Sequence, residues 1–243
     1  MKVVLSTFLS DIIDEEVDNM KNIPIRDLES SRLIIKRPTM EEQFSLWSIL
    51  KDEKVNRYYF PTPDRIFAKN GLKNDNIDDM KRARSIFLEQ LNDWERQEPF
   101  YEKKITAIQN GENSQKFTWS IFLKTGEVIG QITVQPNSEY PENPEIRDIG
   151  WFIKPIYQGK GYGTEAAKEV LDYMFNEVEI DKIITSAAII NEGSWKLMEK
   201  LGFERIGEKQ STYYDEEDNI LMSYCYIGDK EMFLNKDNKV YKK

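Results

Sequence analysis

A glycine-dense stretch in the middle of the chain has the residue types best suited to chemistry. It lies between an apolar, strand-like run and an amphipathic helical pattern. Glycine lets the backbone approach a ligand closely, and the first N–H groups of a helix have no partner within the helix. Together these groups can hold a pyrophosphate, because a helix N-terminus also favours negative charge. The predicted anion cradle consists of Gln158, Gly159, Lys160, Gly161, Tyr162, Gly163 and Thr164.

Two other phosphate-binding motifs fit this stretch poorly. A dinucleotide fold requires G-x-G-x-x-G, but Thr164 stands where the last glycine would be, and the P-loop pattern is absent. Two helical and two hairpin-like strand patterns also precede the stretch, whereas a Rossmann unit opens its sheet with this turn. The readings left open are a cradle for another pyrophosphate and a structural glycine turn without a ligand.

Composition limits the classes of function. The chain has 243 residues, 40% of them hydrophobic, which can bury the core of one domain. It carries 34 Lys and Arg against 43 Asp and Glu, a formal charge of -9. This balance argues against a nucleic-acid or anionic-membrane partner and favours cationic substrates. With Cys225 alone and no His, neither a disulfide framework nor a zinc site is expected, which fits a cytoplasmic protein without a metal.

Residues 1–27 are expected to form an amphipathic helical extension. The apolar residues at helical spacing are Leu5, Phe8, Leu9, Ile12, Ile13, Val17 and Met20. This stripe can pack on its own domain, form a dimer contact or cover the substrate side, so a monomer and a homodimer both stay open. A secretory signal is rejected, because the apolar core is short and an acidic run follows it. No run reaches the roughly 18 apolar residues that a membrane span requires.

The remaining patterns mix helices and strands. In the first half, strands are predicted at 32–37, 117–123 and 128–135, with helices after the Thr39/Glu42 capping box and at 78–97, beyond a long loop at 70–79. In the second half, strands are predicted at 146–153, 182–189, 204–213 and 220–227, with helices at 161–177 and 192–201. The lysine-rich segment after Phe233 is expected to be a frayed terminus. This order predicts an α+β fold with a mixed sheet.

Several motifs together resemble a known family. The stretch 158–163 is similar to the [Q/R]-x-x-G-x-[G/A] signature of the GNAT acetyltransferases, whose ligand is the coenzyme A pyrophosphate. Matching segments stand in the order seen in the Rim-type branch, the ribosomal-protein N-terminal acetyltransferase-like enzymes. These segments are 28–38, 148–155, 164–166, 191–194 and 200–203. The resemblance covers about residues 28–228.

The resemblance implies a fold, a domain and a co-substrate. The fold would be a mixed, mostly antiparallel central sheet of about seven strands flanked by helices. The GNAT domain would occupy 28–228, after the extension at 1–27 and before a short tail at 229–243. Acetyl-CoA would be the co-substrate, with no metal. The acceptor would be a primary amine: a protein or peptide N-terminus, an aminoglycoside, a polyamine or another small amine. The alternatives are an O-acyl or longer-chain transferase, and a non-catalytic acyl-CoA-binding or protein-interaction module on the same fold.

The resemblance also suggests roles for residues in the strand at 146–153 and after it. Backbone groups near Phe152 and Ile153 would hold the pantetheine arm. Asp148 stands where the family has a Glu and could accept the amine proton directly or through water. Glu145 is the alternate carboxylate, and water alone is a third possibility for the base. Either carboxylate could instead attract a cationic acceptor or solvate the end of the strand.

A second group of roles falls on the segment 191–198. Asn191 would contact the pantetheine arm, although Asn is also a common helix N-cap. Ser194 matches a serine proposed as the acid in Rim-type enzymes, with an ordinary helix-start serine as the other reading. Many GNAT enzymes have a Tyr as acid where this chain has Met198, which cannot donate a proton.

The resemblance also places the acceptor end, because in related proteins the first two helices and the loop between the last strands frame the acceptor site. Its aromatic candidates are Tyr58, Tyr59, Phe60, Trp94, Tyr213 and Tyr214. They suit a partly apolar pocket, but aromatics at such spacing are more often core residues. The acidic run 215–218 could attract an amine or be a solvated hairpin tip.

Overall fold

The computed structural model describes residues 25–58, 63–109, 116–143 and 145–239. Most of the predicted extension at 1–27, together with Tyr59 and Phe60, lies outside the described residues. The strands are β1 (Leu28–Glu29), β2 (Leu33–Lys36), β3 (Phe117–Leu123), β4 (Val128–Pro136), β5 (Ile146–Ile153), β6 (Lys182–Ala188), β7 (Glu204–Tyr214) and β8 (Ile220–Asp229). The helices are α2 (Met40–Lys51), α3 (Glu53–Asn56), α4 (Pro63–Asn70), α5 (Ile77–Leu91), α6 (Trp94–Gln109), α7 (Tyr162–Tyr173), α8 (Glu192–Lys200) and α9 (Lys230–Lys239).

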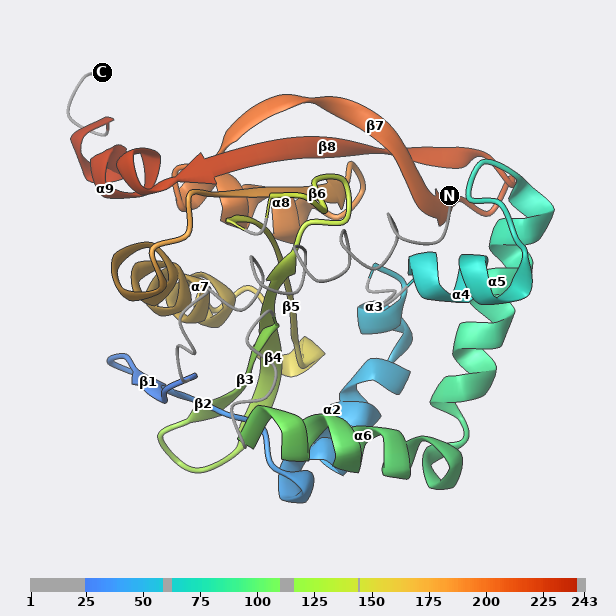
Figure 1. Cartoon of the computed structure of the whole chain (residues 1–243), viewed down its shortest axis with the longest axis horizontal. Helices are drawn as coiled ribbons and strands as arrows, with labels where there is room; N and C mark the ends of the chain where they lie inside the picture. Colours follow the sequence, from blue (N-terminus) through green and yellow to red (C-terminus); the bar gives the residue numbers. More distant parts are fainter. Residues whose placement is uncertain (1–24, 59–62, 110–115, 144, 240–243) are drawn as a thin grey trace, which may run out of the picture.

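One sheet connects the whole described chain (Figure 1). Its strand order is β1-β2-β3-β4-β5-β6-β8-β7. Every neighbouring pair is antiparallel except β5 and β6. The α+β fold with a mixed, mostly antiparallel sheet is therefore confirmed. The sheet has eight strands rather than about seven, because the two residues of β1 pair with Ile34 and Ile35 of β2.

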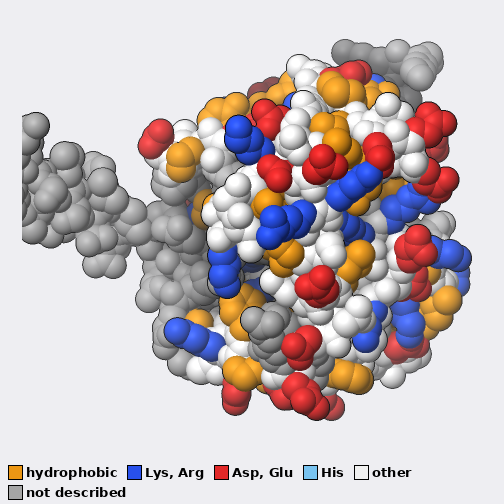
Figure 2. All heavy atoms as spheres, turned by 90° about the vertical axis from the view of Figure 1, so that its right-hand side faces the viewer, with side chains coloured by type: hydrophobic (Ala, Val, Ile, Leu, Met, Phe, Trp, Pro, Cys, Tyr) orange, Lys and Arg blue, Asp and Glu red, His pale blue; other side chains and the backbone are white. Residues whose placement is uncertain are grey.

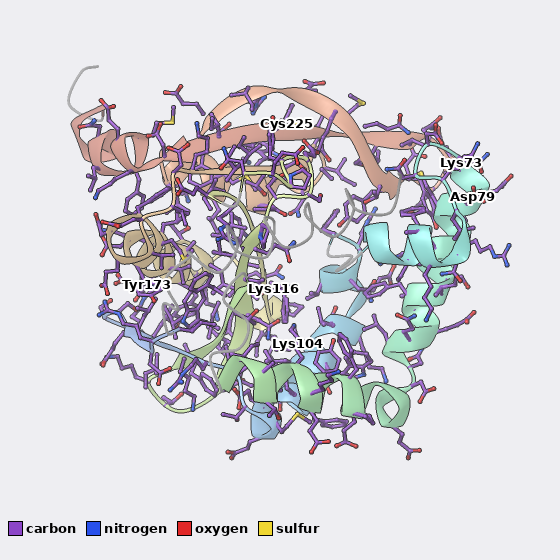
Figure 3. The ribbon with its side chains drawn as sticks, in the orientation of Figure 1. Lys73, Asp79, Lys104, Lys116, Tyr173 and Cys225 are labelled. Atoms are coloured by element: carbon purple, nitrogen blue, oxygen red, sulfur yellow. The ribbon has the colours of Figure 1, made fainter. Side chains whose placement is uncertain are left out.

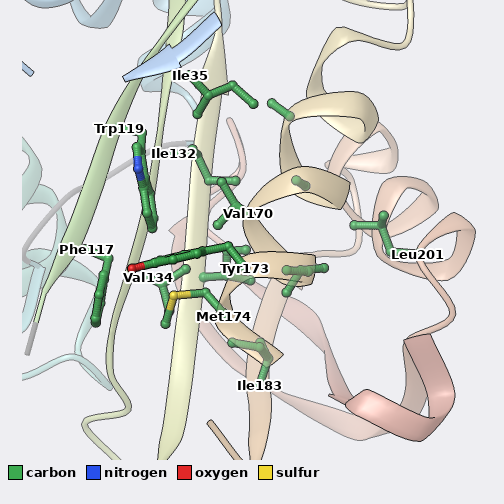
Figure 4. Packing of buried hydrophobic residues seen from close by; sticks show 14 of the residues in the cluster. Ile35, Phe117, Trp119, Ile132, Val134, Val170, Tyr173, Met174, Ile183 and Leu201 are labelled. Carbon is green, nitrogen blue, oxygen red and sulfur yellow. The ribbon is translucent and has the colours of Figure 1, made fainter. Parts of the chain in front are cut away.

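The helices cover the two faces of the sheet separately (Figure 1). On one face, Val170 of α7 packs with Ile132 and Val134 of β4, and all three side chains are fully buried (Figure 4). On the other face, α2, α4 and α5 form a second apolar cluster, which reaches the sheet through Phe152. The alternation of β4 explains the division, because its neighbouring residues point to opposite faces.

The sequence placed several element boundaries correctly. The strand at 146–153 coincides with β5, and the hairpin at 117–135 turns through Gly126, whose φ of +94° favours glycine. The capping box is also confirmed. The backbone N–H of Thr39 donates to Oε1 of Glu42 at 2.7 Å, and the Thr39 side chain accepts from the N3 backbone of α2.

Two predicted segments differ from the structure. The single helix expected at 78–97 is two helices, because α5 ends at Leu91 and the chain turns through Asn92 and Asp93 before α6 begins. The segment after Phe233 is not a frayed terminus through Lys239, because it belongs to helix α9. Phe233 anchors that helix: it is 4% exposed, and its ring centroid lies 5.9 Å from that of Phe175. Burial of one aromatic side chain thus stabilises a helix that its polar neighbours did not predict.

Candidate active site

One cleft joins most of the residues singled out from the sequence. Its volume is about 1890 Å³, and it runs between the C-terminal half of β5 and the starts of α7 and α8. Its other wall comes from α2, α5, α6 and β7. A cleft of this size exceeds the usual range for a drug-sized ligand, so it can hold a long donor and an acceptor together.

The cleft enters the sheet where β5 and β6 separate. The two parallel strands pair only through Ile146 with Lys182 and Arg147 with Ile183. Beyond these pairs the strands diverge, and the hydroxyl of Thr185 donates to the carbonyl of Ile149 at 3.2 Å. The later backbone groups of β5 are left facing the gap, where they can bind an extended ligand as a further strand would.

Backbone alternation decides which residues of β5 face this gap. The carbonyl of Phe152 points at β4, since it lies 2.2 Å from where a Cβ on Gly130 would stand. The backbone N–H and C=O groups of Ile149, Trp151 and Ile153 therefore face the β6 side. The carbonyl of Ile153 accepts from Nε2 of Gln158 at 2.8 Å, which leaves its N–H group toward the gap. Of the backbone groups near Phe152 and Ile153, those of Trp151 and Ile153 thus face the gap, and the carbonyl of Phe152 faces β4.

The glycine turn has the backbone of an anion cradle. Gly159 and Gly161 have φ of +72° and +82°, and α7 begins directly after them at Tyr162. A Cβ on Gly159 would meet only open space. The N–H groups of Tyr162, Gly163 and Thr164 are in the first turn of α7, and these residues line the cleft. This arrangement fits the pyrophosphate of coenzyme A.

Two long side chains of the turn do not point at the cradle. Gln158 uses its amide to hold the carbonyl of Ile153, so it shapes the turn. Lys160 is exposed, and its Nζ lies 5.4 Å from the centroid of the Tyr157 ring. The cradle is therefore built from backbone, and its side chains position it.

Asp148 lies inside the cleft, whereas Glu145 does not. Burial raises the pKa of the Asp148 carboxyl group, although hydrogen bonds from Thr185, the N–H of Ile149 and Gln135 oppose the shift. Glu145 is exposed in the loop before β5 and is not part of the cleft wall. Of the two carboxylates, only Asp148 can meet an acceptor in the cleft.

Asn191 and Ser194 open helix α8 beside the same gap. Asn191 occupies the N-cap position, but its side chain makes no capping hydrogen bond. Both side chains line the cleft and are half-buried. Met198 is 2% exposed and packs in the main core while touching the cleft. A hydroxyl proton at this end of the cleft can thus come from Ser194 and not from residue 198.

The acceptor candidates divide into two groups. Tyr58 and Tyr213 line the cleft, and the hydroxyl of Tyr213 donates to the carbonyl of Tyr58 at 2.9 Å. Tyr213 and Tyr214 both pack against the second apolar cluster, but Tyr214 does not line the cleft. The side chain of Trp94 is outside the described part. The acidic run 215–218 forms a hairpin tip away from the cleft, where Asp215 accepts from the N–H of Asn219 at 2.8 Å. The run 215–218 is therefore a hairpin tip, which was the second of its two interpretations from the sequence.

Three further residues of the cleft had no role from the sequence. Tyr101 and Lys104 come from α6, and Lys116 immediately precedes β3. The ring of Tyr101 meets Trp47 edge-on at 5.5 Å, and burial raises its pKa to about 12. Only the tertiary packing of α6 against the sheet brings these residues to the cleft.

The described residues contain neither a candidate membrane-spanning helix nor a candidate metal-binding cluster. No helix among them has the length and apolar character needed to cross a bilayer. Within the same ranges, no group of three or more His, Cys, Asp or Glu side chains could hold a metal ion.

Comparison with known proteins identifies the family. Residues 32–204 match the model of the acetyltransferase (GNAT) domain, so the chain belongs to the GNAT acetyltransferases. It is 42% identical over 112 residues to the uncharacterized N-acetyltransferase YnaD of Bacillus subtilis, a match over 44% of this chain and 62% of that protein. The chain spans about half to three-fifths of the length of the first curated relatives it matches.

Solved structures share the fold at low sequence identity. A spermidine N-acetyltransferase from Vibrio cholerae, in complex with CoA and spermine, has a TM-score of 0.58 and 15% identity over 85% of this chain and 100% of that one. A ribosomal-protein-S5-alanine acetyltransferase from Vibrio fischeri has a TM-score of 0.58 and 14% identity over 85% and 98%. At these identities the likeness concerns the fold.

Proposed function

We propose that this protein transfers an acetyl group from acetyl-CoA to a primary amine by direct attack. The observation that carries the proposal is the gap between β5 and β6, with the backbone cradle at 159–164 at one end and the Asp148 carboxylate in the same cleft. A donor bound by its pyrophosphate at the start of α7 would lay its pantetheine arm along Trp151 and Ile153. Its thioester would then lie toward Asp148 and Ser194.

The residues divide the proton transfers between them. The amine nitrogen attacks the thioester carbonyl carbon, the C–N bond forms and the C–S bond breaks. Asp148 takes the proton that the amine loses, directly or through a water molecule, and its raised pKa brings it closer to that task. The hydroxyl of Ser194 donates a proton to the departing thiolate, which leaves as the thiol of CoA, and Ser194 regains a proton from water; Asp148 releases the amine proton to water. Orientation of the two reactants in one cleft supplies a further part of the rate.

The acceptor is an amine of a small molecule or a peptide N-terminus. Structural neighbours include an enzyme solved with spermine and one named for a ribosomal protein, so both acceptor types occur on this fold. The half-buried position of Asp148 favours an amine on a slender group, because a bulky one would not reach the carboxylate.

A thiol-release assay over a panel of amines tests the proposal. We expect acetyl-CoA to raise the melting temperature and at least one amine to release CoA with one acetylated product per thiol. Binding of acetyl-CoA without acetylation of any amine would favour the non-catalytic acyl-CoA-binding reading. Absence of acetyl-CoA binding would overturn both.

A further inference from the structure

Two half-buried lysines face the cleft on the side away from the cradle. Lys104 belongs to α6, and Lys116 is the residue immediately before β3. Both lie on the face of the sheet that α2 and α6 cover (Figure 3). Lys104 lies 5.9 Å from the centroid of the Tyr101 ring. Within the described residues, no carboxylate forms an ion pair with either ammonium group. The other lysines of the cleft are exposed or, like Lys209 with Glu139, paired.

Both ammonium groups are held partly out of water at a cost. Burial lowers the pKa of Lys104 to about 8, and repulsion from Lys116 contributes to the shift. Burial also lowers the pKa of Lys116, against the attraction of Asp148. Unpaired, partly desolvated cations destabilise a fold unless something compensates them. A bound anion would restore the ordinary preference of both lysines for the charged form.

The charge of the cleft differs from that of the chain. Among the described residues that line it are seven lysines and five carboxylates, although the whole chain has a formal charge of -9. The face formed by α4 and α5 carries both signs interspersed (Figure 2). A dication such as a polyamine would therefore meet an unfavourable field beside Lys104 and Lys116.

Lys116 is also within electrostatic range of the predicted base. The Asp148 carboxylate acts on Lys116, and all three residues line one cleft. The pyrophosphate cradle, in contrast, is at the start of α7, where the donor phosphates would lie. An anion at the lysines would thus belong to the acceptor and lie near the amine that Asp148 deprotonates.

We propose that Lys104 and Lys116 form an anion subsite at the acceptor end of the cleft, and that the acceptor is a small amine carrying a carboxylate or a phosphate group. The inference rests on the proposed acetyl transfer and narrows its acceptor. Two lysines are point charges with rotatable donors, so they accept both anions. The comparison of carboxylate and phosphate amines distinguishes the two sources.

The test compares amines that differ in their second group. With the wild-type enzyme, kcat/KM for γ-aminobutyrate or phosphoethanolamine should exceed that for butylamine and for putrescine at least about tenfold, the value of one charge-assisted hydrogen bond. In Lys104→Met and in Lys116→Met this preference should largely disappear. Lys104→Arg should retain most of it. The matched control is Lys103→Met, which removes an exposed lysine of the same helix outside the cleft wall.

Each outcome decides one question. If butylamine or putrescine is acetylated as fast as the anionic amines, acetyl transfer stands and the anion subsite is overturned. If no amine releases CoA, the proposed function itself fails. If the Met variants lose acetyl-CoA affinity while their melting temperatures are unchanged, the lysines bind the donor and the subsite is wrongly placed. If the variants do not fold, inhibition of the wild type decides: inorganic phosphate should compete with the amine and not with acetyl-CoA, and the reverse pattern would refute the proposal.

Discussion

Arg32 joins Lys160 of the cradle turn to Glu165 in the first turn of α7. Its Nε donates to Oε2 of Glu165 at 2.6 Å, and its Nη1 donates to the carbonyl of Lys160 at 3.1 Å. The guanidinium also lies 4.5 Å from the centroid of the Tyr162 ring. Ser30, Ser31 and the backbone of Arg32 donate to the other carboxylate oxygen of Glu165. The turn between β1 and β2 therefore fixes the start of α7.

Glu165→Gln should weaken acetyl-CoA binding, although residue 165 does not line the cleft. The amide can accept only part of this network, so the turn loosens and the dissociation constant should rise about three- to tenfold, as for a lost charge-assisted hydrogen bond. Isothermal titration calorimetry measures the change. Glu169→Gln, one turn further along α7, is the control and should leave the affinity within twofold. Equal affinities for both variants would mean that the Arg32–Glu165 network does not contribute to acetyl-CoA binding.

Gly161→Val should abolish acetyl-CoA binding, and this loss should be separate from the stability that the substitution also costs. A β-branched residue at φ of +82° is strained by about 1–2 kcal/mol, and its Cβ would lie 3.4 Å from Nη2 of Arg32. Gly71→Val has a similar strain at φ of +64° in a turn outside the cleft. Both variants should lose similar stability on urea denaturation, and only Gly161→Val should lose the thermal shift with acetyl-CoA. A normal shift in that variant would refute the cradle.

Asp148→Asn should lower turnover and change its pH dependence. The base must be ionised, so kcat/KM of the wild type should fall as pH decreases through the raised pKa of Asp148. In Asp148→Asn that decline should vanish, with kcat reduced about 10²–10⁴-fold. Glu145→Gln, in the exposed loop before β5, should behave as wild type. A full acidic limb in the Asn variant would assign the base to another group.

Ser194→Ala should slow the departure of the thiolate. Loss of a positioned proton donor costs about 10²-fold or more in kcat. The acetyl-CoA dissociation constant should stay within twofold, because the contacts proposed for Asn191 and the backbone would remain. Single-turnover kinetics separates this step from product release. Unchanged turnover would leave Ser194 as a helix-start residue only.

Lys104→Met should stabilise the fold while impairing the enzyme. The wild-type lysine has a pKa of about 8 when folded, below its ordinary value of 10.5. A lowered lysine pKa destabilises the folded state fully below pH 8, and this cost disappears as pH rises to 10.5. The variant should therefore gain about 1–3 kcal/mol at pH 7, allowing for the part of the side chain that water reaches, and little near pH 10.5. Denaturant titrations at both pH values, with Lys103→Met as control, measure the difference. A gain that is the same at both pH values would mean that packing, not charge, causes it.

Regular elements with clear periodicity could be predicted from the sequence, and short or packed ones could not. β5 is a largely apolar run followed closely by Pro155, so its bounds followed from the sequence. The two-residue β1 has no period to detect. The break at Asn92 carries no Gly or Pro, and Pro99 falls inside α6, so local propensity gave the wrong boundary there.

The site shows the same division. The end of β5 and the cradle form one continuous segment, 151–164, whose glycine spacing the sequence shows directly. The acceptor half brings together α6, the residue before β3 and β5, which are far apart in the chain, and no spacing connects Lys104 with Asp148. The net charge of -9 favoured cationic substrates. A total charge, however, carries no information about which charged residues line a cleft.

The two residue pairs that join β5 to β6 make the sheet two half-sheets with a seam. A donor lying in that seam would bridge the halves with its own amide groups. Its binding free energy would then add to the free energy of unfolding in proportion to the logarithm of its concentration. The free energy of unfolding of this protein would thus report the concentration of free acetyl-CoA around it.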